Sequence, residues 1–201
     1  KLARIDGMES FTGHSFHTSR WDFDYTGSDL ENLHDKVVGI IGTGATAVQA
    51  VPNLARTAKE LYVFQRTPSS IDVRDDWETD PEWAKTLTPG WQAKRRERAM
   101  QMGSLTALRV DADGKEISAE EKVRRQENAN IDYMMRIHKR IDQIVEDKTT
   151  ADALKPWYMF MCKRPCFHND YLPTFNRPSV HLVDTHGKGI TEITARGPVF
   201  D

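Results

Sequence analysis

The clearest pattern of hydrophobic and polar positions lies in the first third of the chain, where two apolar segments flank a glycine-containing turn and an amphipathic segment. Residues 36–41 form a β-branched apolar run of the kind that parallel sheets bury, and residues 61–64 form a second. Residues 48–58 place apolar side chains on one side of a predicted helix, in which Pro52 must lie near the first turn or produce a kink. The pattern predicts a strand, a turn over residues 42–47, a helix and a strand.

Helical patterns dominate residues 71–159. Asp80 is followed by proline and glutamate, which is typical of a capped helix start. Ser118 begins a capping box that starts another helix, and the basic run Lys94–Arg98 is interpreted as a solvated helix face. The helix after Ser118 carries five apolar side chains at three- and four-residue steps, Ile131, Met134, Ile137, Ile141 and Ile144.

Short strands return at the end of the chain. Residues 180–184 are apolar and alternate weakly, and residues 193–200 predict a hairpin that turns at Arg196 and Gly197. Strands that flank a helical segment indicate an α/β domain with an insertion. We expect four segments: a linker at 1–28, the first part of the α/β domain at 29–70, a mostly helical insertion at 71–159 and the second part of the domain at 160–201.

A phosphate-binding motif occupies the predicted turn. Gly42-x-Gly44-x-x-Ala47 follows one predicted strand and begins the predicted helix. Gly42 permits the tight turn, Gly44 allows a pyrophosphate to approach the backbone, and Ala47 lets the helix pack close to the strand. The helix N-terminus then offers unpaired N–H groups to the phosphates. We therefore predict a Rossmann-like dinucleotide-binding domain interrupted by a mostly helical subdomain, rather than a merely structural turn.

The residues after the second predicted strand indicate which nucleotide is bound. An NAD site needs an acidic residue about 20 residues after the glycines, to accept hydrogen bonds from the ribose 2′-hydroxyl. Here Arg66 and Thr67 stand at that place, with Arg66 22 residues after Gly44. A guanidinium and a hydroxyl suit a 2′-phosphate instead, so NADPH is favoured over NADH. The alternative is that Arg66 is an ordinary exposed loop arginine.

Composition and charge exclude several function classes. The 201 residues include 28 Lys and Arg against 30 Asp and Glu, a net charge of −2 that provides no basic field for nucleic acid or a membrane surface. No apolar stretch approaches the roughly 18 residues of a membrane-spanning helix. Cys162, Cys166 and His168 lack a fourth ligand at zinc-finger spacing, so no metal is expected. Few cysteines and no secretory pattern favour a cytoplasmic protein.

A second motif lies in the predicted linker and carries a family resemblance. Its fixed positions match the FxGxxxHxxxW[PD] fingerprint of Baeyer–Villiger monooxygenases: Phe11, Gly13, His17, Trp21 and Asp22. The resemblance implies a flavoprotein that uses NADPH, FAD and O₂ to insert one oxygen atom next to a ketone carbonyl, giving an ester or lactone. Related flavin-dependent N- and S-oxygenases have a tyrosine-type ending where Trp21 and Asp22 stand here, so the resemblance at these last two positions favours the Baeyer–Villiger family. It also implies that His17 is a hinge contact between domains rather than an acid or base.

The same resemblance implies roles for two further groups of residues. A Lys-Arg pair follows the helical insertion in this family, so Lys163 would join Arg66 and Thr67 around the 2′-phosphate. Arg164 would be the catalytic arginine beside the flavin, where a permanently charged donor fork stabilises negatively charged oxygen. The side chains around the glycine turn would contact the pyrophosphate and the nicotinamide ribose, namely Thr43, Ala45, Thr46, Ala47 and Gln49.

The resemblance covers only the middle of the family's architecture. The chain begins at Lys1 and contains no earlier glycine loop for FAD, so we expect a fragment whose FAD site lies mostly outside it. By itself it is expected neither to retain FAD nor to turn over. Two alternatives stay open at this point: a flavin-dependent N- or S-oxygenase or N-hydroxylase, and a non-catalytic NADP-binding sensor module.

Overall fold

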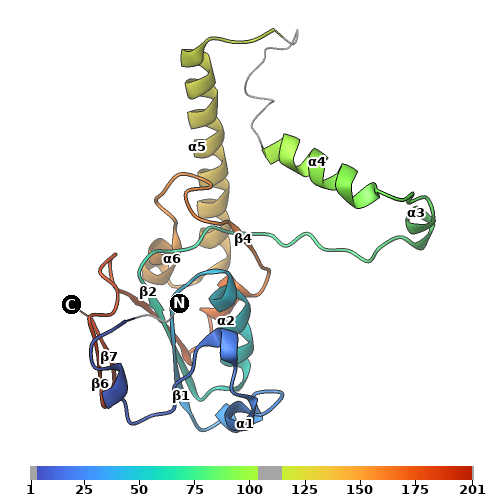
Figure 1. Cartoon of the computed structure of the whole chain (residues 1–201). Helices are drawn as coiled ribbons and strands as arrows, with labels where there is room; N and C mark the ends of the chain where they lie inside the picture. Colours follow the sequence, from blue (N-terminus) through green and yellow to red (C-terminus); the bar gives the residue numbers. More distant parts are fainter. Residues whose placement is uncertain (1–3, 104–114, 201) are drawn as a thin grey trace. The chain divides into compact units, whose positions relative to one another are not determined.

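Two compact units make up the chain in a computed structural model that describes residues 4–103 and 115–200. One unit comprises Lys1–Arg74 and Met134–Asp201, and the other comprises Asp75–Tyr133 (Figure 1). Residues 71–74 and 134–159 therefore pack with the first unit, so the second unit is shorter than the predicted insertion of residues 71–159.

A three-stranded parallel sheet forms the centre of the first unit. Its strands are β1 (Val37–Ile41), β2 (Glu60–Gln65) and β5 (Val180–Asp184), in the order β1-β2-β5. All three strands were predicted from their apolar runs. β-branched side chains lose little conformational freedom in a strand and are buried in a parallel sheet. The α/β class with a parallel sheet is thus confirmed.

Helix α2 (Ala45–Thr57) connects β1 to β2 and packs against both strands (Figure 1). It begins three residues earlier than predicted, so Pro52 lies in its interior and is neither near its first turn nor at its end. Its buried side turns toward the sheet, where each fully buried aliphatic side chain contributes about 1.5–3 kcal/mol. The apolar residues buried here in helix and sheet include Val48, Val51, Leu54, Leu61 and Val63.

The N-terminal segment is attached to a C-terminal hairpin of β6 (Glu192–Thr194) and β7 (Gly197–Val199), whose antiparallel pairing confirms the predicted hairpin. The Ile193 N–H donates to the Asp6 carbonyl at 2.8 Å. Gly7 precedes the short 3₁₀ helix η1 (Met8–Ser10) with φ +77°, and a β-carbon there would lie 2.2 Å from the Ile193 carbonyl oxygen. Only glycine fits at position 7, where the N-terminal segment passes the backbone of β6.

A long helix, α5 (Ala119–Ile144), begins where the capping box predicted: the Ser118 hydroxyl oxygen accepts from the Glu121 N–H at 3.2 Å. Its apolar stripe is buried only toward the C-terminal end, because Ile137 and Ile141 are 0 % exposed whereas Ile131 is 52 % exposed. Helices α6 (Lys148–Leu154) and α7 (Tyr171–Thr174) and the parallel pair β3 (Ile71–Asp72) and β4 (Cys166–Phe167) complete the first unit.

The second unit holds helices α3 (Pro81–Lys85) and α4 (Trp91–Gly103) and the first part of α5. The Asp80 carboxylate accepts from the Glu82 N–H at 2.9 Å, which confirms the predicted helix start. Side chains 94–97 are exposed, as expected for a solvated helix face. Among the described residues, no helix combines the length and apolar character that crossing a membrane requires.

Candidate functional site

The glycine turn joins the end of β1 to the start of α2. Gly42 adopts φ +105° and donates its N–H to the Phe64 carbonyl at 2.9 Å, and Gly44 is extended and precedes the helix without a side-chain cap. A β-carbon at either glycine would have no other atom within 4 Å. A hollow of about 200 Å³ lies over this turn. The structure therefore leaves both the backbone N–H groups of a helix start and the space above them open to an anion.

The first turn of α2 adds no negative charge to this hollow. Ala45, Thr46 and Ala47 line it; the first two are exposed and Ala47 is 7 % exposed. Gln49 is exposed one turn further along and donates its side-chain N–H to the Ala45 carbonyl at 3.0 Å. The arrangement keeps the partial positive charge of the helix N-terminus uncompensated by an acidic side chain.

Thr43 lies in the turn but connects two loops. Its side chain is nearly buried, and its hydroxyl donates to the Thr67 carbonyl at 2.7 Å. The Ser69 hydroxyl donates in return to the Thr43 carbonyl. The loop after β1 is thus fixed to the loop after β2, which keeps the glycine turn and the predicted phosphate-binding residues at the same edge of the sheet.

Arg66 follows β2 directly, at the carboxyl end of the strand. Its side chain is exposed, and among the described residues its guanidinium makes no hydrogen bond or ion pair. Thr67 is half-buried beside it. Because parallel strands end at the same edge of a sheet, Arg66 lies at the edge that also carries the Gly42 turn. This edge therefore carries the positive charge of Arg66, which no acidic side chain in the described part of the chain pairs with.

Lys163 is brought to the same loop by Tyr158. The Lys163 ammonium lies 5.3 Å from the centroid of the Tyr158 ring, a cation–π contact. The Tyr158 hydroxyl donates to the Pro68 carbonyl at 3.0 Å and accepts from the Ser70 N–H at 3.1 Å. Lys163 therefore contacts a ring whose hydroxyl is bonded to the segment that follows β2, the segment that begins with Arg66. No pattern in the sequence indicates this role of Tyr158.

Arg164 precedes β4 and is exposed, with no hydrogen bond or ion pair to its guanidinium among the described residues. Its segment is held in place because the Cys166 N–H donates to the Ser70 carbonyl at 2.9 Å. Burial raises the pKa of the Cys166 thiol, and the charge of Arg164 lowers it to a smaller extent. Cys162 is a free, exposed thiol. No group of three or more His, Cys, Asp or Glu side chains among the described residues is arranged to hold a metal ion.

The first half of the fingerprint is a packing arrangement. The Phe11 ring lies over Gly13, where an ideal β-carbon would be 2.5 Å from the ring carbon Cζ. The Thr12 N–H between them donates to the Ala195 carbonyl at 3.2 Å, so this segment is attached to the hairpin of β6 and β7. Any side chain at position 13 would therefore displace the Phe11 ring from its present place.

The second half of the fingerprint caps two short helices. The Asp22 carboxylate accepts from the Tyr25 N–H at 3.0 Å and so caps α1 (Phe23–Thr26), and it accepts from the His14 ring at 2.9 Å. These bonds, the one from Tyr25 foremost, lower the pKa of Asp22. His17 caps η2 (Thr18–Arg20) by accepting the Ser19 N–H at 3.1 Å. The pairing of His14 with Asp22 could not be predicted from their spacing in an irregular segment.

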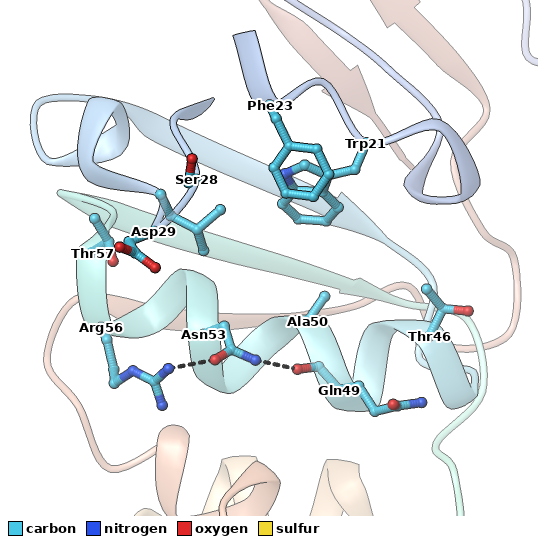
Figure 2. Close-up of a pocket in the computed structure, with 11 residues that line it drawn as sticks. Trp21, Phe23, Ser28, Asp29, Thr46, Gln49, Ala50, Asn53, Arg56 and Thr57 are labelled. Carbon is cyan, nitrogen blue, oxygen red and sulfur yellow. Dashed lines mark hydrogen bonds between the residues drawn. The ribbon is translucent and has the colours of Figure 1, made fainter. Parts of the chain in front are cut away.

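Trp21 connects the fingerprint to a second hollow. Its indole N–H donates to the Thr26 hydroxyl at 3.0 Å. Figure 2 shows the Trp21 and Phe23 rings facing the side chains of α2 across this space. The hollow measures about 510 Å³ and shares Thr46 with the hollow above the glycine turn. Thr46 in the first turn of α2 therefore lines both the hollow at the glycine turn and the one that Trp21 of the fingerprint borders.

Comparison with known proteins was made on the whole sequence and on the structure. No protein-family model matches the chain. Neopentalenolactone D synthase of Streptomyces avermitilis is 49 % identical over 96 % of the chain and 36 % of its own length. A Baeyer–Villiger monooxygenase of Stachybotrys chlorohalonatus is 49 % identical over 98 % of the chain and 35 % of its own length.

Solved structures agree with these sequence matches. The polycyclic ketone monooxygenase of Thermothelomyces thermophila superposes with a TM-score of 0.83 at 38 % identity, over 99 % of this chain and 36 % of that one. A crystal structure of OTEMO in complex with FAD and NADP gives a TM-score of 0.70 at 30 % identity, over 100 % of this chain and 42 % of that one. The chain thus spans about a third of the length of the relatives it matches. These matches confirm the family resemblance predicted from the fingerprint, and the chain corresponds to one region of the Baeyer–Villiger monooxygenases.

Proposed function

We propose that this chain is the NADPH-binding region of a flavin-dependent Baeyer–Villiger monooxygenase. Such an enzyme uses NADPH and O₂ to insert one oxygen atom next to the carbonyl of a small-molecule ketone, and it releases an ester or a lactone. The match of nearly the whole chain to named monooxygenases of this type supports the proposal most strongly. The sensor-module and N- or S-oxygenase alternatives have no such support.

The fold assignment that goes with this function is a Rossmann-like dinucleotide-binding domain. In it β1, α2 and β2 form the first nucleotide-binding half, and the mostly helical residues 71–159, of which 75–133 form a compact unit of their own, interrupt the domain in sequence. Residues 1–28 are the linker between dinucleotide domains, in which His17 is a hinge contact. Two unpaired cysteines agree with a reducing compartment such as the cytoplasm.

The residues at the glycine turn fit the pyrophosphate of a dinucleotide. Gly42 and Gly44 leave open space where side chains would stand, and the N-terminus of α2 carries no competing acidic group. The Thr43 hydroxyl holds the turn against the loop after β2 by donating to the Thr67 carbonyl. Thr46 and Gln49 border the hollow that continues toward the fingerprint, on the side where the nicotinamide ribose is proposed to lie.

The residues after β2 fit a 2′-phosphate. Arg66 offers a planar set of donors that no side chain in the described part of the chain engages, and Thr67 adds a hydroxyl. Lys163 adds a second positive charge through its position over Tyr158. A dianionic phosphate gains from both cations, whereas the bare 2′-hydroxyl of NADH gains little.

Arg164 is proposed as the catalytic arginine. When bound, NADPH would supply a hydride and FAD would activate O₂. Arg164 keeps its charge at every working pH, and its guanidinium is free to face a negatively charged oxygen atom in the reaction. The bond between the Cys166 N–H and the Ser70 carbonyl holds the segment of Arg164 beside the loop that begins with Arg66.

Titration of the purified chain with NADPH and NADH tests the binding assignment. The unsubstituted chain is expected to prefer NADPH, and Arg66→Ala should weaken NADPH binding about tenfold or more, since a hydrogen bond to a charged group contributes about 1.5–3 kcal/mol. NADH binding should change little. Arg196→Ala, which removes an exposed arginine from the turn between β6 and β7, is the control. Equal losses for both nucleotides would overturn the assignment.

A chimera tests the activity. Residues 1–201 would replace the matching part of the Thermothelomyces polycyclic ketone monooxygenase, which the chain covers to 36 %. The chimera should oxidise a ketone to an ester with NADPH, and Arg164→Ala in it should abolish ester formation while NADPH binding to the chimera persists. An Arg164→Ala chimera with unchanged ester formation would exclude the catalytic role.

A further inference from the structure

The loop that follows β5 contacts the segment that follows β2, and no step of the proposed function uses it. Thr185 is 1 % exposed. Both its N–H and its hydroxyl donate to the Gln65 carbonyl, each at 2.9 Å. Gln65 is the last residue of β2 and immediately precedes Arg66. The β5 loop therefore determines where the backbone leaves β2 toward Arg66.

Gln65 is also held by its side chain. It is 0 % exposed, and its side-chain N–H donates to the Ala153 carbonyl of α6 at 2.8 Å. Backbone and side chain of this residue are thus both fixed, on one side by the β5 loop and on the other by α6. The backbone on which Arg66 is mounted has little freedom, even though the Arg66 side chain is exposed.

Gly189 supports the Arg66 side chain itself. The Gly189 N–H donates to the Thr185 hydroxyl at 2.9 Å, so the same hydroxyl connects Gln65 and Gly189. An ideal β-carbon at Gly189 would lie 3.3 Å from Cδ and 3.8 Å from Cγ of Arg66. The aliphatic part of the arginine therefore lies against a residue without a side chain.

We propose that Thr185 and Gly189 are positioning residues for Arg66 and that they set the preference for a 2′-phosphorylated nucleotide. The inference rests on the proposed function, because it concerns the 2′-phosphate subsite. A long side chain loses considerable rotational freedom when it binds an anion, and a surface that already orients it reduces that loss. Thr185 fixes the backbone, and the bare surface of Gly189 leaves the stem of Arg66 in its present rotamer.

Two glycines of this loop provide a matched pair of variants. Gly189 has φ +88° and Gly187 has φ +85°, so alanine imposes similar backbone strain at both positions. A β-carbon at Gly187 meets no atom within 4 Å, whereas one at Gly189 presses on Arg66. Gly189→Ala should weaken NADPH binding about threefold with NADH unchanged, because the stem of Arg66 must shift by a few tenths of an ångström to make room for the new β-carbon. Gly187→Ala should alter neither affinity.

Measuring the NADPH and NADH affinities of Gly189→Ala in an Arg66→Ala background isolates the contact between Gly189 and Arg66. If Gly189 acts through Arg66, Gly189→Ala has no further effect on NADPH binding once the arginine is gone. An equal effect in both backgrounds would overturn the inference. Equal effects of Gly189→Ala and Gly187→Ala on NADPH would overturn it as well, because backbone strain alone would then explain both.

Thr185 is tested by removing and restoring its hydroxyl. Thr185→Val should lower the ratio of NADPH to NADH affinity, and Thr185→Ser, which keeps the hydroxyl, should restore it. A loss of thermal stability with an unchanged ratio would show a structural role only and would contradict the proposal. If the unsubstituted chain binds no NADPH, the proposed function fails. If it binds NADPH through Arg66 while the Gly189 and Thr185 variants keep full selectivity, only this inference fails.

Discussion

The contact between Phe11 and Gly13 allows a quantitative test of why the fingerprint begins with an aromatic residue and a glycine. In Gly13→Ala the new β-carbon would lie 2.5 Å from Cζ and 2.7 Å from Cε1 of the Phe11 ring. Carbon atoms pack favourably at about 3.5–4.0 Å, so the ring must move by about 1 Å or rotate out of place. Phe11 is only half-buried, so we expect the low end of the cost of overpacking, about 1 kcal/mol.

Urea denaturation of Gly13→Ala, followed by far-UV circular dichroism, measures this loss. With a urea slope of about 1–3 kcal/mol/M, the midpoint should fall by about 0.3–1 M. The informative comparison is the double variant: in a Phe11→Ala background the ring is absent, so Gly13→Ala should cost little. If the alanine lowers the midpoint equally with and without the ring, the steric explanation of the motif is wrong.

Two further predictions concern titration and thiol chemistry. The lowered pKa of Asp22 means that its contribution to stability is present above pH 3.8, its ordinary value, and is lost as the pH falls through the lower folded value. The stability difference between the unsubstituted chain and Asp22→Asn, from urea midpoints, should therefore shrink on acidification; a constant difference from pH 7 to pH 3 would contradict this. Cys162 is exposed and should react quickly with a thiol reagent, whereas burial and a raised pKa should make Cys166 slow, so Cys162→Ser should remove the fast phase.

The sequence alone determined the elements that local pattern controls. The apolar runs at β1, β2 and β5, the helix starts after Asp80 and Ser118 and the C-terminal hairpin follow from residue order, because strand burial, capping and turn chemistry involve neighbours a few residues apart. The fingerprint and the glycine turn also carried the resemblance to the Baeyer–Villiger monooxygenases.

Tertiary structure decided which distant side chains meet. Lys163 contacts Tyr158, whose hydroxyl bonds to the loop after β2, and Thr185 and Gly189 lie beside Gln65 and Arg66 because β5 lies next to β2. The pairing of β3 with β4 and the boundaries of the two compact units were likewise beyond local pattern. Such contacts depend on strand order and on the path of the chain between strands, and no local periodicity encodes either.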